Sequence, residues 1–183
     1  MESQTLQKFK WFWAWQDEEE ETWLRGMSQQ GWHLMSVGLP GFYSFARGEA
    51  RNYVYRLDYV NSKADFVEYV QLFQDAGWEH LGAMGGWQYF RTQALPGKTP
   101  DIYTDVESKI QKYRRVLGYL LPFFPLWIIF SNNVADRALE SAEAGGLLRV
   151  LGALFFIFFF SFMLLYFYAI IRLGQRIRQL KKL

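Results

Sequence analysis

The sequence predicts a ferredoxin-like α+β domain in the cytoplasm, followed by two transmembrane α-helices. One observation behind this fold class is an internal repeat of strand, helix, strand and strand within the first 95 residues. The other is a pair of long apolar segments after residue 115. We therefore divide the chain into a duplicated domain over 1–95, a linker over 96–104 and a membrane region over 105–183.

The two repeats are related by an offset of 46 residues. Gly31–Trp32 falls on Gly77–Trp78, and Tyr43 falls on Tyr89. The helical positions of the repeats align as Trp23 with Tyr69, Leu24 with Val70 and Met27 with Phe73. Each repeat ends in two strands joined by a turn sequence, "LPG" or "GG". Two such units predict one antiparallel sheet with both helices on the same face.

The stretch "FKWFWAWQDEEEE" is expected to contain a strand and the beginning of a helix. Its alternating aromatic residues indicate a strand whose one face is buried: Phe9, Trp11, Trp13 and Trp15. The acid run 17–21 has capping-box spacing, which Ser62 and Asp65 repeat, and acids are favoured in the first turn of a helix. We interpret Glu18 to Glu21 as an exposed helix start, and binding of a cation is the alternative.

The membrane region is expected to cross the bilayer twice, over about 114–132 and about 148–171. Its second apolar run, Val150 to Ile171, forms a helix about 33 Å long, enough for a hydrocarbon core of roughly 30 Å. The first run contains Pro122 and Pro125. These prolines are expected to kink the helix where a neighbouring segment satisfies the freed carbonyl groups.

The basic residues predict the orientation of the membrane region. Two, Arg137 and Arg149, lie in the loop between the apolar runs. Nine lie outside the runs and close to their ends: Lys109, Lys112, Arg114, Arg115, Arg172, Arg176, Arg178, Lys181 and Lys182. Basic residues flanking membrane spans concentrate on the cytoplasmic side. The protein is therefore expected in the cell membrane, in contact with the lipid bilayer, with both termini in the cytoplasm and a basic C-terminal tail.

Charge and composition argue against several classes of function. Residues 1–104 carry 9 basic and 13 acidic residues, so the predicted domain is net negative and nucleic-acid binding is disfavoured. The chain has no cysteine, which excludes disulfides and thiolate metal sites. It has neither a phosphate-binding loop motif nor an interpretable Ser, His and acid set. We therefore assign no catalytic residue, no metal and no cofactor, and a non-enzymatic role is favoured.

Four segments resemble an uncharacterised family of membrane proteins from Gram-positive (Firmicute) bacteria, catalogued as a domain of unknown function. They are "FWAWQDEEEETWL", "GWHLMSVG", "YVYRLDY" and "DAGWEHLGAMGGWQYFR", and the resemblance covers roughly Lys8 to Arg115. Family members are often encoded beside a PadR-type transcriptional repressor. The resemblance thus implies a regulated role in stress or in the cell envelope, and it assigns no catalytic residue.

A polar face of the predicted sheet carries the candidate binding residues. They are Lys10, Arg56, Asp58, Arg47 and Arg91. The cations of this face would receive an anionic ligand or an acidic segment of a partner, and we expect a homodimer or a partner contact through it. A solvated face with a local Arg56–Asp58 pair is the alternative.

Two further sets of residues have a structural and a functional interpretation. The tryptophans fit a buried core, with a cage for a cationic or aromatic ligand as the alternative. His33 and His80 fit ordinary strand positions, with metal binding or proton transfer as the alternative.

These observations favour a membrane-anchored cytoplasmic sensor or adaptor whose domain binds a partner protein or a small ligand. The alternatives are a small membrane enzyme acting on a lipid or amphiphile, and an accessory subunit of a transporter.

Overall fold

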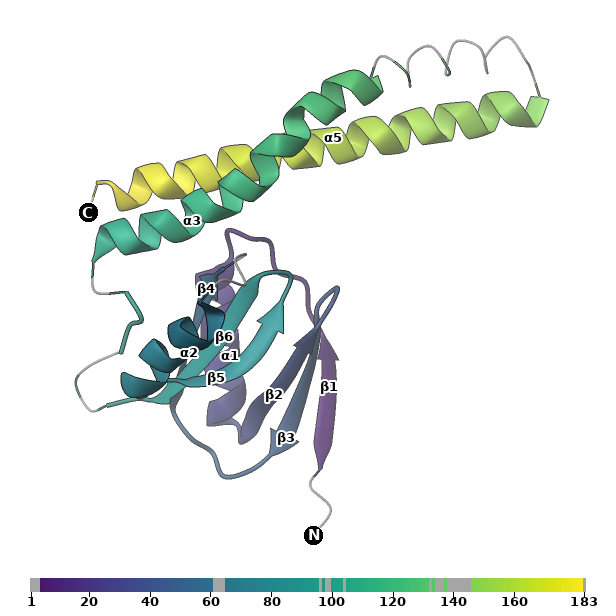
Figure 1. The fold of residues 1–183 in the computed structure, drawn as a ribbon. Helices are drawn as coiled ribbons and strands as arrows, with labels where there is room; N and C mark the ends of the chain where they lie inside the picture. The colour runs from purple at the N-terminus through teal and green to yellow at the C-terminus, as the bar shows by residue number, and fades with distance from the viewer. Residues whose placement is uncertain are drawn as a thin grey trace.

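The computed structural model describes residues 4–60, 65–95, 97, 100–103, 105–131, 133, 137 and 146–182. Within these residues the chain forms two three-stranded antiparallel sheets with two helices, and a pair of longer helices that lie side by side next to them (Figure 1).

Three strands form the first sheet in the order β1-β3-β2: β1 (Thr5–Phe9), β2 (Trp32–Gly38) and β3 (Phe42–Arg47). Helix α1 (Asp17–Gln29) connects β1 to β2. Alternate residues of β3, Tyr43 and Phe45, are buried, as expected for a strand with one face in a core.

The second sheet has the order β4-β6-β5 and contains β4 (Tyr53–Tyr59), β5 (Glu79–Met84) and β6 (Trp87–Gln93). Helix α2 (Phe66–Asp75) connects β4 to β5. Both sheets therefore have the same connectivity. Each also has a register shift in its hairpin, between Leu34 and Ser36 in the first sheet and between His80 and Gly82 in the second. These shifts lie at the same offset as the sequence repeat.

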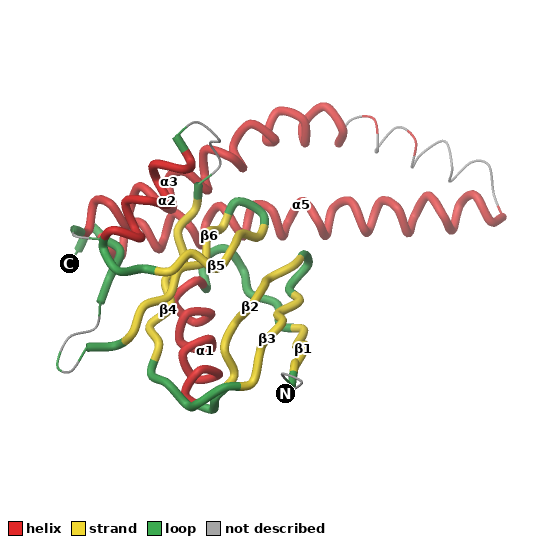
Figure 2. Tube along the Cα trace, turned by 60° about the horizontal axis from the view of Figure 1, so that its bottom comes forward, coloured by secondary structure: helices red, strands yellow, loops and turns green. Residues whose placement is uncertain are grey.

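The expectation of a ferredoxin-like domain is wrong, because the six strands form two sheets and the two helices pack on different faces. Helix α1 lies between β4 and β2 (Figure 2), where Leu24 and Met27 join a core that contains Leu34 of the first sheet and Leu57 of the second. Helix α2 packs on the opposite face of the second sheet. There Phe73 contacts a second cluster of Val54, Trp78 and Phe90.

The physical reason is that the second sheet is apolar on both faces. Tyr55 and Leu57 of β4 point to one face, and Val54 between them points to the other, yet all three are almost completely buried. A sheet with two apolar faces needs a covering layer on each. The strand periodicity within each repeat predicts the local pairing, but it does not determine how two sheets pack against each other.

The N-terminal strand lies earlier in the chain than expected and shares only Phe9 with the predicted one. It ends at Phe9, and residues 10–16 form a loop with a turn before α1. The prediction that the aromatic residues of this stretch point into a core is wrong for Phe9 and Trp11. Phe9 is 59% exposed and Trp11 is 50% exposed. The loop instead stacks Trp13 on Trp15, with ring centroids 5.4 Å apart and planes 3° from parallel.

The expectation of two membrane spans is also wrong. Among the described residues, one helix is long and apolar enough to cross a membrane: Arg149–Leu180, within α5 (Gly146–Leu180), whose most apolar 18 residues have a mean hydropathy of 2.5. The segment expected as the first span is divided between α3 (Val106–Leu120), the 3-10 turn η1 (Leu121–Phe123) and helical residues 124–131. Residue 132 and most of the loop that follows lie outside the described residues.

The prolines explain this division. A proline has no backbone N–H and clashes with the preceding turn of a helix, so Pro122 and Pro125 interrupt the α-helical ladder. The amide of Phe124 donates to Leu121 within the 3-10 turn, and the carbonyl of Leu120 instead accepts a hydrogen bond of 2.8 Å from the Tyr166 hydroxyl of α5. The prediction that a neighbouring segment would satisfy a carbonyl at this kink is confirmed at Leu120.

Helices α3 and α5 are held against the end of the two-sheet domain. Ile110, Tyr113 and Val116 of α3 pack with Leu173 of α5 and with Tyr59 at the end of β4. Two further contacts reach α5: Trp15 of the loop before α1 packs edge-on against Tyr168, and Glu18 of α1 forms an ion pair with Arg176. The junction between the domain and these helices is therefore both apolar and charged.

Candidate ligand-binding site

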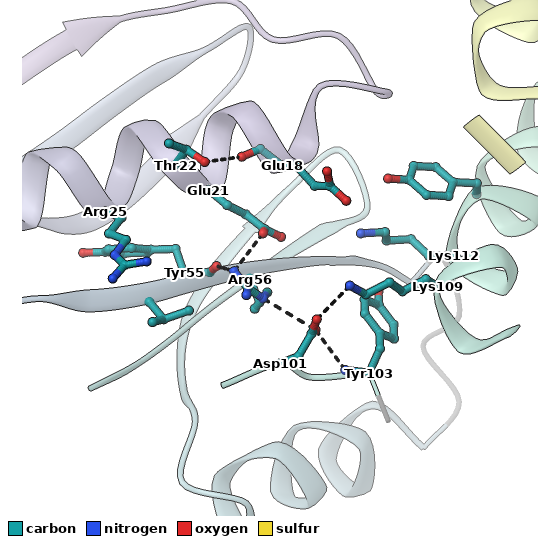
Figure 3. A pocket seen from close by; sticks show the side chains of 12 residues that line it. Glu18, Glu21, Thr22, Arg25, Tyr55, Arg56, Asp101, Tyr103, Lys109 and Lys112 are labelled. Atoms are coloured by element: carbon teal, nitrogen blue, oxygen red, sulfur yellow. Dashed lines mark hydrogen bonds and ion pairs between the residues drawn. The ribbon is translucent and has the colours of Figure 1, made fainter. Parts of the chain in front are cut away.

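A polar cavity of about 300 Å³ lies at this junction, between α1, β4, the segment 101–103 and α3 (Figure 3). Its walls combine charged side chains, phenol rings and one aliphatic residue. The lining residues are Glu18, Glu21, Thr22, Arg25, Val54, Tyr55, Arg56, Asp101, Tyr103, Lys109, Lys112 and Tyr113. Four of these are cationic and three are acidic, so the cavity is suited to a small polar molecule that carries charge.

The innermost part of the site is a buried ion pair. Lys112 donates a hydrogen bond of 2.5 Å to Asp17 and a second of 3.2 Å to the carbonyl of Leu57. The hydroxyl of Tyr113 donates to both carboxylate oxygens of Asp17, at 2.9 and 3.1 Å. Asp17, the first residue of α1, thus holds two consecutive residues of α3, and Lys112 also contacts β4 through the carbonyl of Leu57. Because these groups satisfy each other, they are structural and are not free for a ligand.

Glu21, one turn along α1, holds the middle of β4. It accepts hydrogen bonds from the amide of Leu57 at 2.8 Å and from the guanidinium of Arg56 at 3.0 Å. Burial disfavours the charged carboxylate more strongly than Lys112 and Arg56 favour it, which raises the pKa of Glu21 to about 7. The site therefore contains a carboxyl group that changes charge near neutral pH.

Asp101 connects the segment after the second sheet to both sides of the cavity. It lies 2.7 Å from Lys109 of α3 and 3.5 Å from Arg56 of β4, and Figure 3 shows it between these two cations. Partial burial opposes ionisation of Asp101, but the hydrogen bond from Lys109 and the charge of both cations outweigh it and lower the pKa of this carboxyl. Asp101 is therefore an anion held by cations of two different elements.

The acid run at the start of α1 is only partly exposed. Glu18 and Glu19 face solvent, but Asp17, Glu20 and Glu21 are buried, so the interpretation as an exposed helix start is wrong for Glu20 and Glu21. Glu20 accepts hydrogen bonds of 2.7 Å from the hydroxyls of both Tyr43 and Tyr89, which join it to the main core. Burial raises its pKa despite these two donors.

The predicted capping boxes do not form among the described residues. Gln16 is the N-cap of α1, and its side-chain oxygen accepts a hydrogen bond of 3.0 Å from the amide of Trp13. Asp65 precedes α2 in a left-handed conformation without a capping hydrogen bond from its side chain. Ser62 lies outside the described residues.

Asp58 is the centre of a second buried network beside the cavity. Its carboxylate accepts hydrogen bonds from Tyr69 of α2 at 3.0 Å, from Tyr103 at 2.7 Å and from Arg115 of α3 at 2.6 Å. The polar side of β4 is therefore covered by other segments of the same chain. The strand alternation predicts Arg56 and Asp58 on this side, but it does not predict which residues cover them.

The other three predicted binding residues lie elsewhere on the domain. The ammonium group of Lys10 lies 4.8 Å from the ring centres of both Phe12 and Trp23. Arg47 donates to the carbonyl of Gln30 at 2.7 Å, and Arg91 forms an ion pair with Glu79 at 2.7 Å. Of the five candidates, Arg56 lines the cavity and Asp58 lies next to it.

The two histidines are in strands and do not line this cavity. His33 Nε2 lies 2.8 Å from the carbonyl of Glu49, and His80 Nε2 lies 3.0 Å from the side-chain oxygen of Gln88. Within the part of the chain that the structure describes, no cluster of three His, Cys, Asp or Glu side chains has a geometry for a metal ion.

Fold and site together define a class of protein: a two-sheet α+β domain joined by a buried charge pair to helices, one of which is long and apolar enough to cross a membrane. The chain belongs to the family described as "Protein of unknown function (DUF2812)", whose model matches residues 16–124. All twelve residues that line the cavity fall within this match. Comparisons with curated proteins and with solved structures gave no match.

Proposed function

We propose that this protein is a membrane-anchored sensor or adaptor whose α+β domain binds a small anionic ligand in the cavity between α1, β4 and α3. The observation that carries this proposal is the pair of cations that face each other across the cavity, Arg56 on β4 and Lys109 on α3, with the Asp101 carboxylate between them. An anion bound to both cations would connect the domain directly to α3.

Asp101 occupies the position that a ligand carboxylate or phosphate would take. Its side chain is 28% exposed and that of Lys109 is 33% exposed, so both are reachable from solvent, in contrast to the buried Asp17–Lys112 pair. A ligand anion with several oxygens forms charge-assisted hydrogen bonds to both cations and displaces Asp101. Displacement frees the segment 101–103 from α3, which is the conformational change that a sensor requires.

The anchoring part of the proposal rests on α5. Glu18 pairs with Arg176 near the C-terminal end of α5, so the domain lies beside that end of the helix. That end also carries the basic residues Arg172, Arg176, Arg178, Lys181 and Lys182. Basic residues mark the cytoplasmic side, which supports a cytoplasmic domain in the cell membrane. In this position the domain would transmit a ligand-induced conformational change to a membrane protein partner or to a second copy.

The test uses the full-length protein in detergent and two probe anions, inorganic phosphate and citrate. Native mass spectrometry of the purified protein first shows whether a small molecule is carried through purification. Titration of each anion then follows the change in tryptophan fluorescence in the wild type, in Lys109→Gln and in Asp101→Asn. A matched control is Lys8→Gln, an exposed lysine on β1 outside the cavity.

The two cavity variants are expected to change affinity in opposite directions. Lys109→Gln removes a charge-assisted hydrogen bond of about 1.5–3 kcal/mol and should weaken binding about 10- to 100-fold. Asp101→Asn removes the competing carboxylate and should strengthen binding. Lys8→Gln should bind as the wild type does. If all four proteins bound the anions equally, or none bound them, the cavity would not be an anion site.

A further inference from the structure

A group of exposed apolar side chains lies at one end of the two-sheet domain. We call it the tip and define it as Phe9, Trp11, Leu39 and Phe42, with exposed fractions between 50% and 74%. Large apolar side chains that are exposed together on a soluble surface mark an interaction site. The tip is therefore an interaction surface of the domain.

Two segments that are distant in sequence form the tip. Phe9 of β1 is paired in register with Phe42 of β3, and their ring centres are 5.2 Å apart. The β2–β3 turn is attached to the chain after β1 by a hydrogen bond of 2.9 Å from the amide of Lys10 to the carbonyl of Gly41. Gly41 has φ +148°, and a Cβ at this position would lie 2.5 Å from the Lys10 carbonyl oxygen. Only glycine permits this approach without a shift of the backbone.

Aromatic rings join the tip to the membrane helix. Trp11 packs edge-on against Trp13 at 5.5 Å, Trp13 stacks on Trp15, and Trp15 packs edge-on against Tyr168 of α5 at 5.5 Å. Tyr168 lies near the end of the apolar run of α5, and Arg172 follows one turn later. Figures 1 and 2 both show the loop after β1 and the β2–β3 turn on the side of the domain that faces α5.

The position and charge of this surface fit a lipid headgroup region. Tryptophan and tyrosine are enriched at the membrane–water interface, where their apolar rings and polar N–H or O–H groups are both accommodated. The first sheet contains no Asp or Glu, and Lys8 and Lys10 flank Phe9 at the tip. Cations beside an apolar surface favour contact with the anionic lipids of a cytoplasmic leaflet.

We propose that the tip inserts into the headgroup region of the bilayer beside α5, so that lipid, in addition to the α3–α5 contacts, holds the domain at the membrane. This inference rests on the anchoring part of the proposed function and is independent of the anion site. An amphipathic surface of this kind lies about 5–10 Å deep in the boundary between headgroups and acyl chains.

The absence of cysteine from the sequence allows a clean test with single-cysteine variants of the full chain. An environment-sensitive fluorophore is attached to Leu39→Cys and Trp11→Cys at the tip, to Leu72→Cys on α2, and to Phe158→Cys on α5. Leu72 and Phe158 are 66% and 69% exposed, similar to the tip residues. Each protein is placed in nanodiscs, one copy in each, with lipids brominated either near the headgroup or deep in the chain, and iodide serves as the aqueous quencher.

We expect headgroup-brominated lipid to quench the labels at residues 39 and 11, deeply brominated lipid to quench the label at residue 158, and iodide to quench the label at residue 72. If residue 158 is quenched by lipid while residues 39 and 11 behave as residue 72 does, the tip is in water and the inference is wrong, although α5 still anchors the protein. If the tip labels are shielded from iodide without quenching by brominated lipid, protein covers the tip, and this also overturns the inference. If residue 158 is not quenched by lipid, the anchoring itself fails.

Discussion

Lys112 of α3 lies 2.5 Å from Asp17 of α1, and both side chains are almost completely buried although 95 positions separate them in sequence. This pair, with Tyr113 on the same carboxylate, holds α3 to the two-sheet domain. Removal of one partner of a buried ion pair leaves the other charge without compensation, which costs more than the pair itself contributes.

Lys112→Met should therefore lower the free energy of unfolding by about 3–5 kcal/mol. The measurement is thermal or urea unfolding of the detergent-solubilised protein. The double variant Asp17→Asn with Lys112→Met removes the unpaired charge and leaves an amide that still accepts from Tyr113, so it should recover part of the loss. A double variant no more stable than the single one would contradict the charge argument and indicate that packing alone is affected.

Glu21 should make stability depend on pH. Its native pKa of about 7 lies above the value of 4.5 for an unperturbed glutamate, so the native state binds a proton more tightly than the unfolded state does. The stabilisation from this group is complete below pH 4.5 and is lost as pH rises through 7. At 1.36 kcal/mol per pH unit, the loss is up to about 3 kcal/mol.

The measurement for this prediction compares wild type with Glu21→Gln between pH 4 and 8, where the amide oxygen still accepts from Leu57. The variant should gain stability relative to the wild type across that window. Glu20, whose pKa is also raised, is present in both proteins, and its effect cancels in the difference. A difference that does not change with pH would show that the pKa of Glu21 is the same in the native and the unfolded state.

Tyr103→Phe should loosen the segment before α3. The Tyr103 hydroxyl donates to buried Asp58 at 2.7 Å, and a hydrogen bond to a charged group is worth about 1.5–3 kcal/mol. We expect a loss near the lower end of this range, because Arg115 still neutralises the Asp58 carboxylate and the Tyr69 hydroxyl still donates a hydrogen bond to it. Tyr119→Phe is the matched control, since the Tyr119 ring is half exposed and its hydroxyl should contribute little. Equal effects of the two variants would argue against Asp58 as the centre of the network.

Reporter fusions test the orientation of α5. A reporter that is active only in the cytoplasm should function when fused after Leu183, because basic residues cluster at the C-terminal end of α5. A reporter that requires an extracytoplasmic location should be inactive at the same position. Activity of the second reporter there would reverse the assigned orientation.

Particular residues explain why some parts of the fold can be predicted from the sequence and others cannot. The hairpins of the two sheets follow from strand alternation and from glycine turns, which are local properties. The relation of one sheet to the other depends on side chains such as Val54 and Phe90 that are apolar on the second face of the sheet. Local periodicity does not show what covers such a face.

The site was missed for a related reason, although a signal was present. Asp17, Glu20 and Glu21 lie on the same helical face as Leu24 and Met27, at spacings of three and four residues. Acids that continue an apolar stripe are predicted to be buried, and buried acids need donors. The donor Lys112 lies far along the chain, and spacing alone does not identify it.

The break between α3 and the next helical segment gives α3 the mechanics of a lever. Lys109 at the cavity and Leu120 before the 3-10 turn are separated by a helical length of about 16 Å at 1.5 Å per residue. A tilt of about 10° around this fulcrum moves the cavity end of α3 by roughly 3 Å, which is the length of one hydrogen bond. The Tyr166 hydroxyl fixes the fulcrum to α5 through the carbonyl of Leu120. A rearrangement no larger than one exchanged anion contact at the cavity would thus tilt α3 against α5 by about this angle.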